Sequence, residues 1–267
     1  MENMTKIGII GLGLIGASIL KSLQNKNYEF YCVSASSFIK AQPFSKVAGD
    51  DINIVKDCDV IFVCSTIENT PKTLEKLNGV LPKNAIVLDV ASSKANLLNK
   101  KYNFDFILSH PMAGTEKSGF DAGKEDLFVG AKWLIEKENP IILQIIKDTG
   151  AIPLKIDMKK HDKMCAQISH LPALISFLLF DITDDSARQI ASSGFRDTTR
   201  LAMTPSHLIF DMVKNNFENI EFYFELLTKE FNYLKNLSDD EKIKVFSAIA
   251  LERKEMYDKD GKNIFKI

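Results

Sequence analysis

The stretch KIGIIGLGLIG, residues 6–16, places a short apolar run directly before three glycines in the spacing GxGxxG. Such a run is typical of a buried strand, and from Leu14 to Leu23 the apolar residues recur at the spacing of one helix face. A GxGxxG motif alone is a weak signal, because glycine pairs occur by chance. Here a strand precedes it and a helix follows, which is the context that a dinucleotide-binding turn requires.

Each glycine of the motif has its own physical role. Gly11 permits the tight turn, Gly13 lets a pyrophosphate approach the backbone, and Gly16 lets the helix pack closely on the strand. Leu14 and Ile15 open the helix, whose N-terminus would hold the phosphates. We therefore expect these five residues to bind NAD or NADP.

Further apolar runs predict the rest of a sheet, because continuous runs suit strands buried on both faces of a parallel sheet. We expect strands at residues 30–34, 60–64, 85–90 and 105–109, and later ones at 132–136 and 152–156. From about Met158 only helical patterns remain. The predicted fold class is α/β: an N-terminal Rossmann-type doubly wound parallel sheet (residues 1–157) followed by an all-α helical domain (residues 158–267).

Within the helical half, three local signals refine this prediction. Pro172 predicts a kink or break in the helix that contains it. Ser238 with Glu241 predicts a capping box at the start of the last helix. Residues 217–237 place large apolar side chains on one helix face, which suits either core packing or a homodimer.

The end of the second predicted strand bears on cofactor choice. Ser34 stands where an Asp or Glu would hold the adenosine ribose of NAD. An uncharged residue there does not repel a 2′-phosphate, and the nearby serines with Lys40 are able to hold one. The choice between NAD and NADP is therefore left open.

Polar residues gather where three predicted strands end. Ser65, which we expect to contact the cofactor, follows the strand at 60–64. Ser92 follows the strand at 85–90, and the stretch SHPMAGTEKSG begins at the end of the next strand. Ligands of open α/β sheets bind beyond these carboxyl ends. His110 lies in that stretch before a proline, on a segment of turn formers, so we interpret it as a general base presented by a loop. An ordinary imidazole predicts activity that rises between about pH 5 and 8.

The helical half supplies other polar candidates. Arg196 and Arg200 share a helix face beside apolar neighbours, so we expect a partly buried segment. Asp197 is an internal partner for one arginine, and we favour Arg200 as the carboxylate binder. His161 and His170 are about half a turn out of phase on one helix, and Cys165 completes no tetrahedral set with them, so we expect no metal site.

Composition excludes several classes of partner. The 34 basic and 35 acidic residues give a net charge of −1, which argues against nucleic acid or an anionic membrane as a partner. The apolar N-terminal run is too short and glycine-rich for a membrane span, and the four cysteines form no CxxC pair. We expect a cytoplasmic protein with a small-molecule substrate.

Five motifs occur in one order along the chain: GLGLIG, DVASSK, SHPMAGTEKSG, HDKMCAQISHLP and GFRDTTRLA. In these the sequence resembles the prephenate dehydrogenase family, the prephenate and arogenate dehydrogenases of tyrosine biosynthesis, over nearly the whole chain. The resemblance implies an N-terminal Rossmann domain and a helical C-terminal domain that builds a homodimer. It also implies that the reaction is an NAD(P)-dependent oxidative decarboxylation.

The resemblance also implies roles for individual residues. His110 matches the catalytic histidine that bonds the substrate's ring hydroxyl, and Ser92 matches a serine that contacts the same hydroxyl and helps to place His110. Thr115 and Glu116 match residues at the substrate mouth. His170 and Arg200 match substrate-binding positions, with Arg200 on a carboxylate.

Two departures from the family pattern concern the substrate pocket. Ala173 replaces a frequent second histidine, and Ile209 replaces a frequent tryptophan. Substrate choice between prephenate and arogenate therefore stays open, as does inhibition by tyrosine. Two further readings are a different two-domain dehydrogenase acting on hydroxy or imino acids, and a dinucleotide sensor without turnover.

Overall fold

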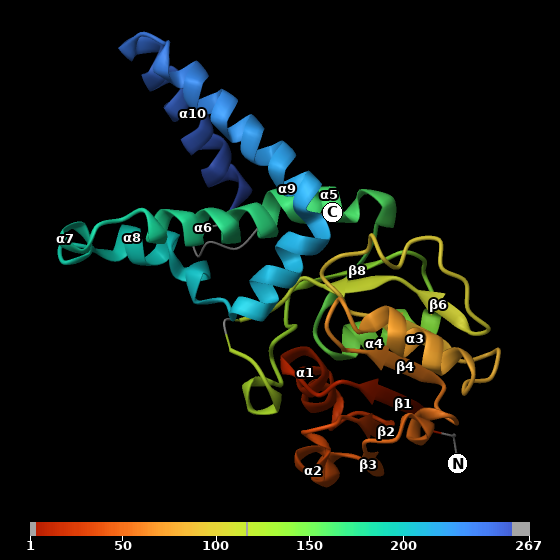
Figure 1. Cartoon of the computed structure of the whole chain (residues 1–267). Helices are drawn as coiled ribbons and strands as arrows, with labels where there is room; N and C mark the ends of the chain where they lie inside the picture. The colour runs from red at the N-terminus through yellow and green to blue at the C-terminus, as the bar shows by residue number, and fades with distance from the viewer. Residues whose placement is uncertain (1–3, 116, 258–267) are drawn as a thin grey trace. The chain divides into compact units, whose positions relative to one another are not determined.

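The computed structural model describes residues 4–115 and 117–257 (Figure 1). The chain divides into two compact units, residues 1–220 and 221–267. The first unit contains both sheets and the helices that pack on them. The second contains the end of one long helix and the helix after it.

The main sheet has six parallel strands in the order β3-β2-β1-β4-β5-β6. These strands are β1 (Thr5–Ile10), β2 (Tyr28–Val33), β3 (Val47–Gly49), β4 (Val60–Val63), β5 (Ile86–Asp89) and β6 (Asp105–Ile107). This order is the one of a dinucleotide-binding sheet and confirms the predicted fold class. The sequence did not predict β3, because three residues are too few to show a strand pattern.

Helices cover both faces of this sheet, and alternate residues of each strand supply the two cores. They are α1 (Leu14–Leu23), α2 (Phe38–Ala41), η1 (Gln42–Phe44), η2 (Ile52–Val55), α3 (Thr70–Asn78), η3 (Phe120–Ala122) and α4 (Pro140–Asp148). Phe62 joins α1 and α4 in one core, whereas its neighbour Ile61 joins α3 in the other. The sheet is therefore doubly wound.

A second, three-stranded sheet carries His110. Its strands are β7 (Ser109–Pro111), β8 (Lys132–Ile135) and β9 (Ile152–Lys155), with β7 antiparallel to β8 and β8 parallel to β9. His110 pairs with Leu134 in this register. The expectation that His110 lies on a loop was therefore wrong. Pro111, which has no N–H to donate, is accommodated because β7 is an edge strand.

From Met158 to Tyr257 the described chain is built of helices and their connections. The helices are α5 (Met158–Cys165), η4 (Ala166–His170), α6 (Leu171–Asp181), α7 (Asp185–Arg188), α8 (Ser193–Thr198), η5 (Arg200–Met203), α9 (Ser206–Lys235) and α10 (Asp239–Met256). The break predicted at Pro172 is present: η4 is a π-helical segment, and α6 begins with Pro172 in its first turn. The capping box of Ser238 and Glu241 is also present. The predicted domain boundary after residue 157 stays a prediction, since the compact units divide at residue 220.

By length and composition alone the 24-residue segment Met158–Asp181 is able to cross a membrane, because an 18-residue window within it has a mean hydropathy of 1.4. Its polar residues argue for a different role. His161, Asp162 and His170 are buried, and each hydrogen-bonds within the first compact unit. We therefore interpret the segment as a helical part of that unit, with one third of its apolar window buried within the chain.

Candidate active site

The glycine turn has the geometry that its spacing predicts. Gly11 has φ +94°, and a Cβ there would lie 2.5 Å from the carbonyl oxygen of Cys64. A Cβ on Gly16 would lie 1.9 Å from the carbonyl oxygen of Gly11, whereas a Cβ on Gly13 would meet nothing within 4 Å. Gly13 thus leaves open space at the N-terminus of α1, where Leu14 and Ile15 begin the helix. Free N–H groups beside open space fit the phosphates of a dinucleotide.

Two serines lie beyond strands next to this turn. Ser34 follows β2, and its Oγ accepts a hydrogen bond from the Ser37 N–H at 3.1 Å. Ser65 follows β4, and its Oγ lies 3.0 Å from the hydroxyl of Thr70 at the start of α3. Lys40, which the sequence offered as a phosphate ligand, forms an exposed ion pair with Asp121. That lysine therefore already has an anionic partner.

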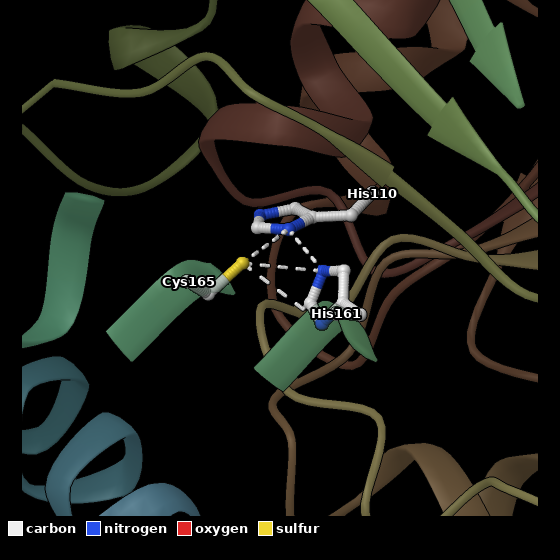
Figure 2. A group of neighbouring side chains, drawn as sticks. All are labelled: His110, His161 and Cys165. Atoms are coloured by element: carbon white, nitrogen blue, oxygen red, sulfur yellow. Dashed lines mark hydrogen bonds between the residues drawn. The ribbon is translucent and has the colours of Figure 1, made fainter. Parts of the chain in front are cut away.

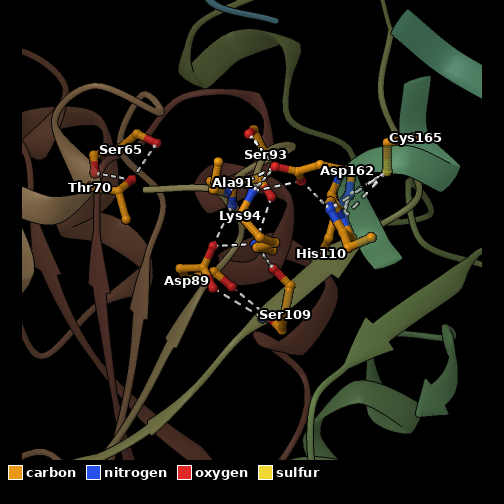
Figure 3. Close-up of polar contacts among 12 residues, drawn as sticks. Ser65, Thr70, Asp89, Ala91, Ser93, Lys94, Ser109, His110, Asp162 and Cys165 are labelled. Carbon is orange, nitrogen blue, oxygen red and sulfur yellow. Dashed lines mark hydrogen bonds and ion pairs between the residues drawn. The ribbon is translucent and has the colours of Figure 1, made fainter. Parts of the chain in front are cut away.

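A fully buried ion pair fixes the edge of the sheet beside His110 (Figure 3). The Nζ of Lys94 donates to the Asp89 carboxylate, to the Ala91 carbonyl at 2.7 Å and to the Ser109 carbonyl at 2.6 Å. The Ser109 N–H and hydroxyl donate back to Asp89, and the indole N–H of Trp133 donates to the Ser109 hydroxyl. Lys94 thereby ties the end of β5 to β7, the strand that holds His110.

Asp162 joins α5 to the loop that follows β5. Its carboxylate accepts hydrogen bonds from the Ser93 hydroxyl at 2.8 Å, the Lys94 N–H at 2.7 Å and the Ala95 N–H at 2.9 Å. Burial by itself raises the pKa of this carboxyl, but hydrogen bonds from His161, Lys94 and Ser93 hold it below its ordinary value. Asp162 is therefore ionised and acts only as an acceptor.

Two histidines continue this chain of hydrogen bonds (Figures 2 and 3). The Nδ1 of His161 lies 2.7 Å from the carboxylate of Asp162, and its Nε2 lies 2.9 Å from the Nδ1 of His110. Because Asp162 accepts, His161 donates through Nδ1 and its Nε2 is an acceptor. His110 then donates through Nδ1, which leaves its Nε2 with a free lone pair. The sequence Asp162–His161–His110 thus sets the tautomer of a base.

His110 is neutral in this setting. Burial first, then the charge of Lys94 and the nearby imidazoles of His161 and His170, lower the pKa of His110 well below its ordinary value of 6.5. The residue as a whole is half-buried. It is therefore both reachable and in the protonation state that a general base needs.

His170, at the end of η4, has one ring nitrogen that is buried without a hydrogen-bond partner among the described residues. The Nδ2 of Asn216 lies 3.0 Å from the Nδ1 of His170 and also donates to the carbonyl of Asp162. His170 is fully buried, and burial lowers its pKa to about 4. Its Nε2 has no hydrogen-bond partner among the described residues. An unpaired buried N–H of this kind is costly unless a ligand accepts from it.

The other predicted substrate-binding residues have fewer hydrogen bonds to the rest of the site. Ser92 is half-buried, and no hydrogen bond joins it to His110 within the described chain. The Thr115 hydroxyl accepts from the Lys117 N–H at 3.2 Å. Glu116 lies outside the described residues. The roles of all three stay predictions.

The segment that carries the two arginines is partly buried, as expected, because Phe195, Leu201 and Ala202 are half-buried, but both arginines are exposed. The Nε of Arg196 pairs with Asp197 at 3.0 Å on the surface, as the sequence allowed. The short α8 and η5 present their arginines to solvent and are tied to α6 by the hydrogen bond from Ser176 to the Thr198 carbonyl. Arg200 forms no ion pair with any residue in the described ranges, so its guanidinium remains available to a ligand.

Sequence reasoning missed several residues of this site: Ser93, Lys94, His161, Asp162, Cys165 and Asn216. Of these, His161 and Cys165 enter the sequence prediction only as members of an incomplete metal-ligand set. In the structure His161 and Asp162 are buried halfway along the first helical segment, which begins at Met158 with Asp157 as its N-cap. The available signal was their spacing, because Met158, His161, Asp162 and Cys165 recur at i, i+3, i+4 and i+7 and form the buried face of a largely charged helix.

Comparisons with known proteins agree with this geometry. Residues 38–149 match the model of the prephenate dehydrogenase nucleotide-binding domain, and residues 157–250 match that of the prephenate dehydrogenase dimerization domain. The arogenate dehydrogenase of Synechocystis superposes with a TM-score of 0.80 at 30% identity, over 93% of this chain and 99% of that one. This chain belongs to the prephenate dehydrogenase family.

Two further relatives bear on cofactor and substrate. The prephenate dehydrogenase of Aquifex aeolicus, in complex with hydroxyphenyl propionate and NAD+, superposes with a TM-score of 0.83 at 25% identity over 94% of this chain and 98% of that one. The prephenate dehydrogenase of Lactococcus lactis subsp. cremoris is 31% identical over 232 residues, which are 80% of this chain but 65% of that enzyme. The family model over residues 38–149 is that of a nucleotide-binding domain, and the open space around Gly13 fits the phosphates of a dinucleotide.

Proposed function

We propose that the chain catalyses the NAD(P)-dependent oxidative decarboxylation of a cyclohexadienyl acid, with prephenate as the first candidate and arogenate as the alternative. One observation carries the proposal: the neutral imidazole of His110, its tautomer set by Asp162 and His161, lies beside a dinucleotide-binding sheet in a chain of this family. The product from prephenate would be 4-hydroxyphenylpyruvate, a step of tyrosine biosynthesis.

His110 moves one proton in this reaction. When bound, the nicotinamide would supply the acceptor for the hydride that leaves the carbinol carbon of the substrate ring. As carbonyl character grows there, the Nε2 of His110 accepts the hydroxyl proton. Loss of the ring carboxylate as CO₂ returns an electron pair to the ring, and the phenolate oxygen takes its proton back from His110. The reaction therefore needs no net proton, and aromatisation drives it.

His170 and Arg200 bind the substrate in this proposal. The unpaired N–H of His170 offers a hydrogen bond to a substrate oxygen. The guanidinium of Arg200, which has no anionic partner among the described residues, supplies a planar fork for a carboxylate. Ser92, Thr115 and Glu116 complete the proposed substrate mouth, with the roles that the family resemblance implies.

Substrate choice is the part of the proposal that needs direct measurement. Relatives named for prephenate and for arogenate both match this chain. Ala173 is buried on α6 one turn after His170, and Ile209 is half-buried on α9. A methyl group and an aliphatic side chain thus stand where the family pattern often has a histidine and a tryptophan. Steady-state kinetics with prephenate and arogenate, each with NAD and NADP, tests the proposal. NAD(P)H formation with either acid supports it, and cofactor binding without turnover on both would reject it in favour of a dinucleotide sensor.

Cofactor preference yields a prediction at Ser34. An aspartate at this position, just beyond β2, would accept hydrogen bonds from the adenosine ribose and repel a 2′-phosphate. Ser34→Asp is expected to raise the ratio of kcat/KM for NAD over NADP by about tenfold, which corresponds to about 1.4 kcal/mol. The ratio is measured at saturating substrate for both cofactors. An unchanged ratio would show that Ser34 does not face the ribose.

The pH dependence of kcat follows from the lowered pKa of His110. Protonated His110 cannot accept the hydroxyl proton, so activity is lost only as the pH falls through this lowered pKa. We expect kcat to be nearly constant from about pH 6.5 to 8 and to decline only at lower pH. This corrects the sequence-based expectation of a rise between pH 5 and 8, because burial and Lys94 shift the titration downward. The pH profile of kcat is recorded with a chelator present, so that metal ions do not affect it. A half-maximal kcat at pH 7 or above would contradict the assignment of His110 as the general base.

A homodimer and a cytoplasmic location complete the proposal. The family model over residues 157–250 is that of a dimerization domain. On α9 and α10 the side chains of Phe224, Phe231, Phe246 and Ile249 are 39–67% exposed, so core packing within the chain does not account for the apolar face of residues 217–237. A second copy of the chain would cover such side chains.

A further inference from the structure

Three side chains from two distant parts of the sequence meet beside the proposed base (Figure 2). His110 comes from β7, and His161 and Cys165 lie one turn apart on α5. One ligand atom from each lies within 4.8 Å of the others. The sequence predicted no metal site, because His161 and His170 are out of phase on one helix. The group found here instead joins His161 and Cys165 to His110, which is 51 residues before His161.

The spacing of these atoms matches three corners of a zinc tetrahedron. Bonds of 2.0–2.1 Å to nitrogen and 2.3 Å to sulfur put two nitrogens about 3.3 Å apart and a nitrogen and a sulfur about 3.6 Å apart. Here the Nδ1 of His110 and the Nε2 of His161 are 2.9 Å apart. The Cys165 sulfur lies 3.4 Å from the Nε2 of His161 and 3.9 Å from the Nδ1 of His110. Shifts of less than about 0.5 Å would bring all three into ideal geometry.

The surroundings suit a divalent cation of borderline softness. Asp162 accepts from the Nδ1 of His161, which is the carboxylate support that orients zinc-bound histidines. Lys94 is the nearby cation, and its charge is paired with Asp89 within the protein. The half-buried His110 gives the cluster contact with solvent. Two imidazoles and a thiolate favour Zn²⁺ over Mg²⁺ or Ca²⁺.

We propose that His110, His161 and Cys165 form a Zn²⁺ site that switches the enzyme off. On binding, Cys165 loses its thiol proton to solvent and its sulfur bonds to the metal. The Nδ1 of His110 gives up its proton to bond the metal, while its Nε2 takes one up. The Nε2 then carries a hydrogen and is unable to accept the hydroxyl proton. The inhibition rests on the proposed function, but the binding does not.

Metal binding is tested on the full chain, first stripped with EDTA. Titration with Zn²⁺ against a chromophoric chelator is expected to give one ion per chain, and Co²⁺ is expected to give a thiolate-to-metal charge-transfer absorption. Cys165→Ala is expected to weaken Zn²⁺ binding by about 100-fold or more, since even residues that only support a ligand cost 10–100-fold. Cys58→Ala, which removes another buried thiol, is the matched control and should bind as the wild type does.

Activity provides the second readout. Zn²⁺ is expected to inhibit the wild type and Cys58→Ala in proportion to occupancy, whereas the rate of Cys165→Ala, compared with its own metal-free rate, resists Zn²⁺. If Cys165→Ala fails to fold, Cys165→Ser replaces it. Equal Zn²⁺ affinity in the wild type and the Cys165 variant, or a Co²⁺ complex without the charge-transfer absorption, would overturn the site. If the chain has no turnover on either acid, the proposed function fails while the binding result still decides the site.

Discussion

Replacing His110 with alanine is expected to lower kcat by about 10²–10⁴-fold, the usual contribution of a general base. The free Nε2 of His110 is the acceptor that the hydrogen bonds of Asp162 and His161 leave available. KM for NAD(P) should change little, because the cofactor fits the turn around Gly13 on a different strand. The measurement is initial-rate NAD(P)H formation with whichever acid proves to be the better substrate, with a chelator present.

His207→Ala is the matched control for this variant, since His207 is exposed and has no role in the site. Its kcat should equal that of the wild type. Near-wild-type kcat in His110→Ala would mean that another group accepts the proton. A loss of cofactor binding in the same variant would instead point to a structural role for the imidazole.

Replacing Lys94 with methionine is expected to destabilise the fold by about 3–5 kcal/mol, because it leaves the buried carboxylate of Asp89 without its partner. The variant also frees the carbonyls of Ala91 and Ser109. Urea unfolding measures the free energy of unfolding, with fluorescence of Trp133 as the probe. Trp133 is the single tryptophan of the chain, is fully buried and donates to Ser109, so it reports on this region.

An exposed ion pair provides the matched control. Lys137 pairs with Asp105, and their side chains are 47% and 40% exposed. Lys137→Met should cost about 0–1 kcal/mol, as surface pairs do. The double variant Asp89→Asn/Lys94→Met should be less destabilised than the sum of its single variants, since the unpaired charge is gone. A Lys94→Met protein as stable as Lys137→Met would show that the pair does not stabilise the sheet edge.

The parts that could be predicted from sequence are those that local sterics decide. The glycine spacing determined the turn, since any side chain at Gly11 or Gly16 would overlap the neighbouring backbone. Apolar runs identified the central strands, because residues buried on both faces leave little room for polar side chains. Pro172 and the pair Ser238 and Glu241 marked helix boundaries through backbone hydrogen bonding.

The candidate site was predicted only in part, because its contacts join residues far apart in the chain. Asp162 receives hydrogen bonds from residues 67–69 positions earlier, and no periodicity encodes such contacts. His110 was identified by its neighbours in sequence, but its strand, its lowered pKa and its partner His161 depend on tertiary packing. The segment around Arg196 and Arg200 is partly buried, as expected, but the arginines themselves are exposed, because apolar neighbours in sequence do not show which side of a short helix meets the core.

One distance tests the central claim most directly. A structure of this protein with NAD+ and a 4-hydroxyphenyl carboxylic acid, the kind of product analogue seen with the Aquifex aeolicus relative, would place the phenolic oxygen relative to His110. The account predicts that the Nε2 of His110 lies about 2.6–3.2 Å from that oxygen, with the analogue's ring against the nicotinamide. A phenolic oxygen bound away from His110, with the carboxylate in its place, would contradict it.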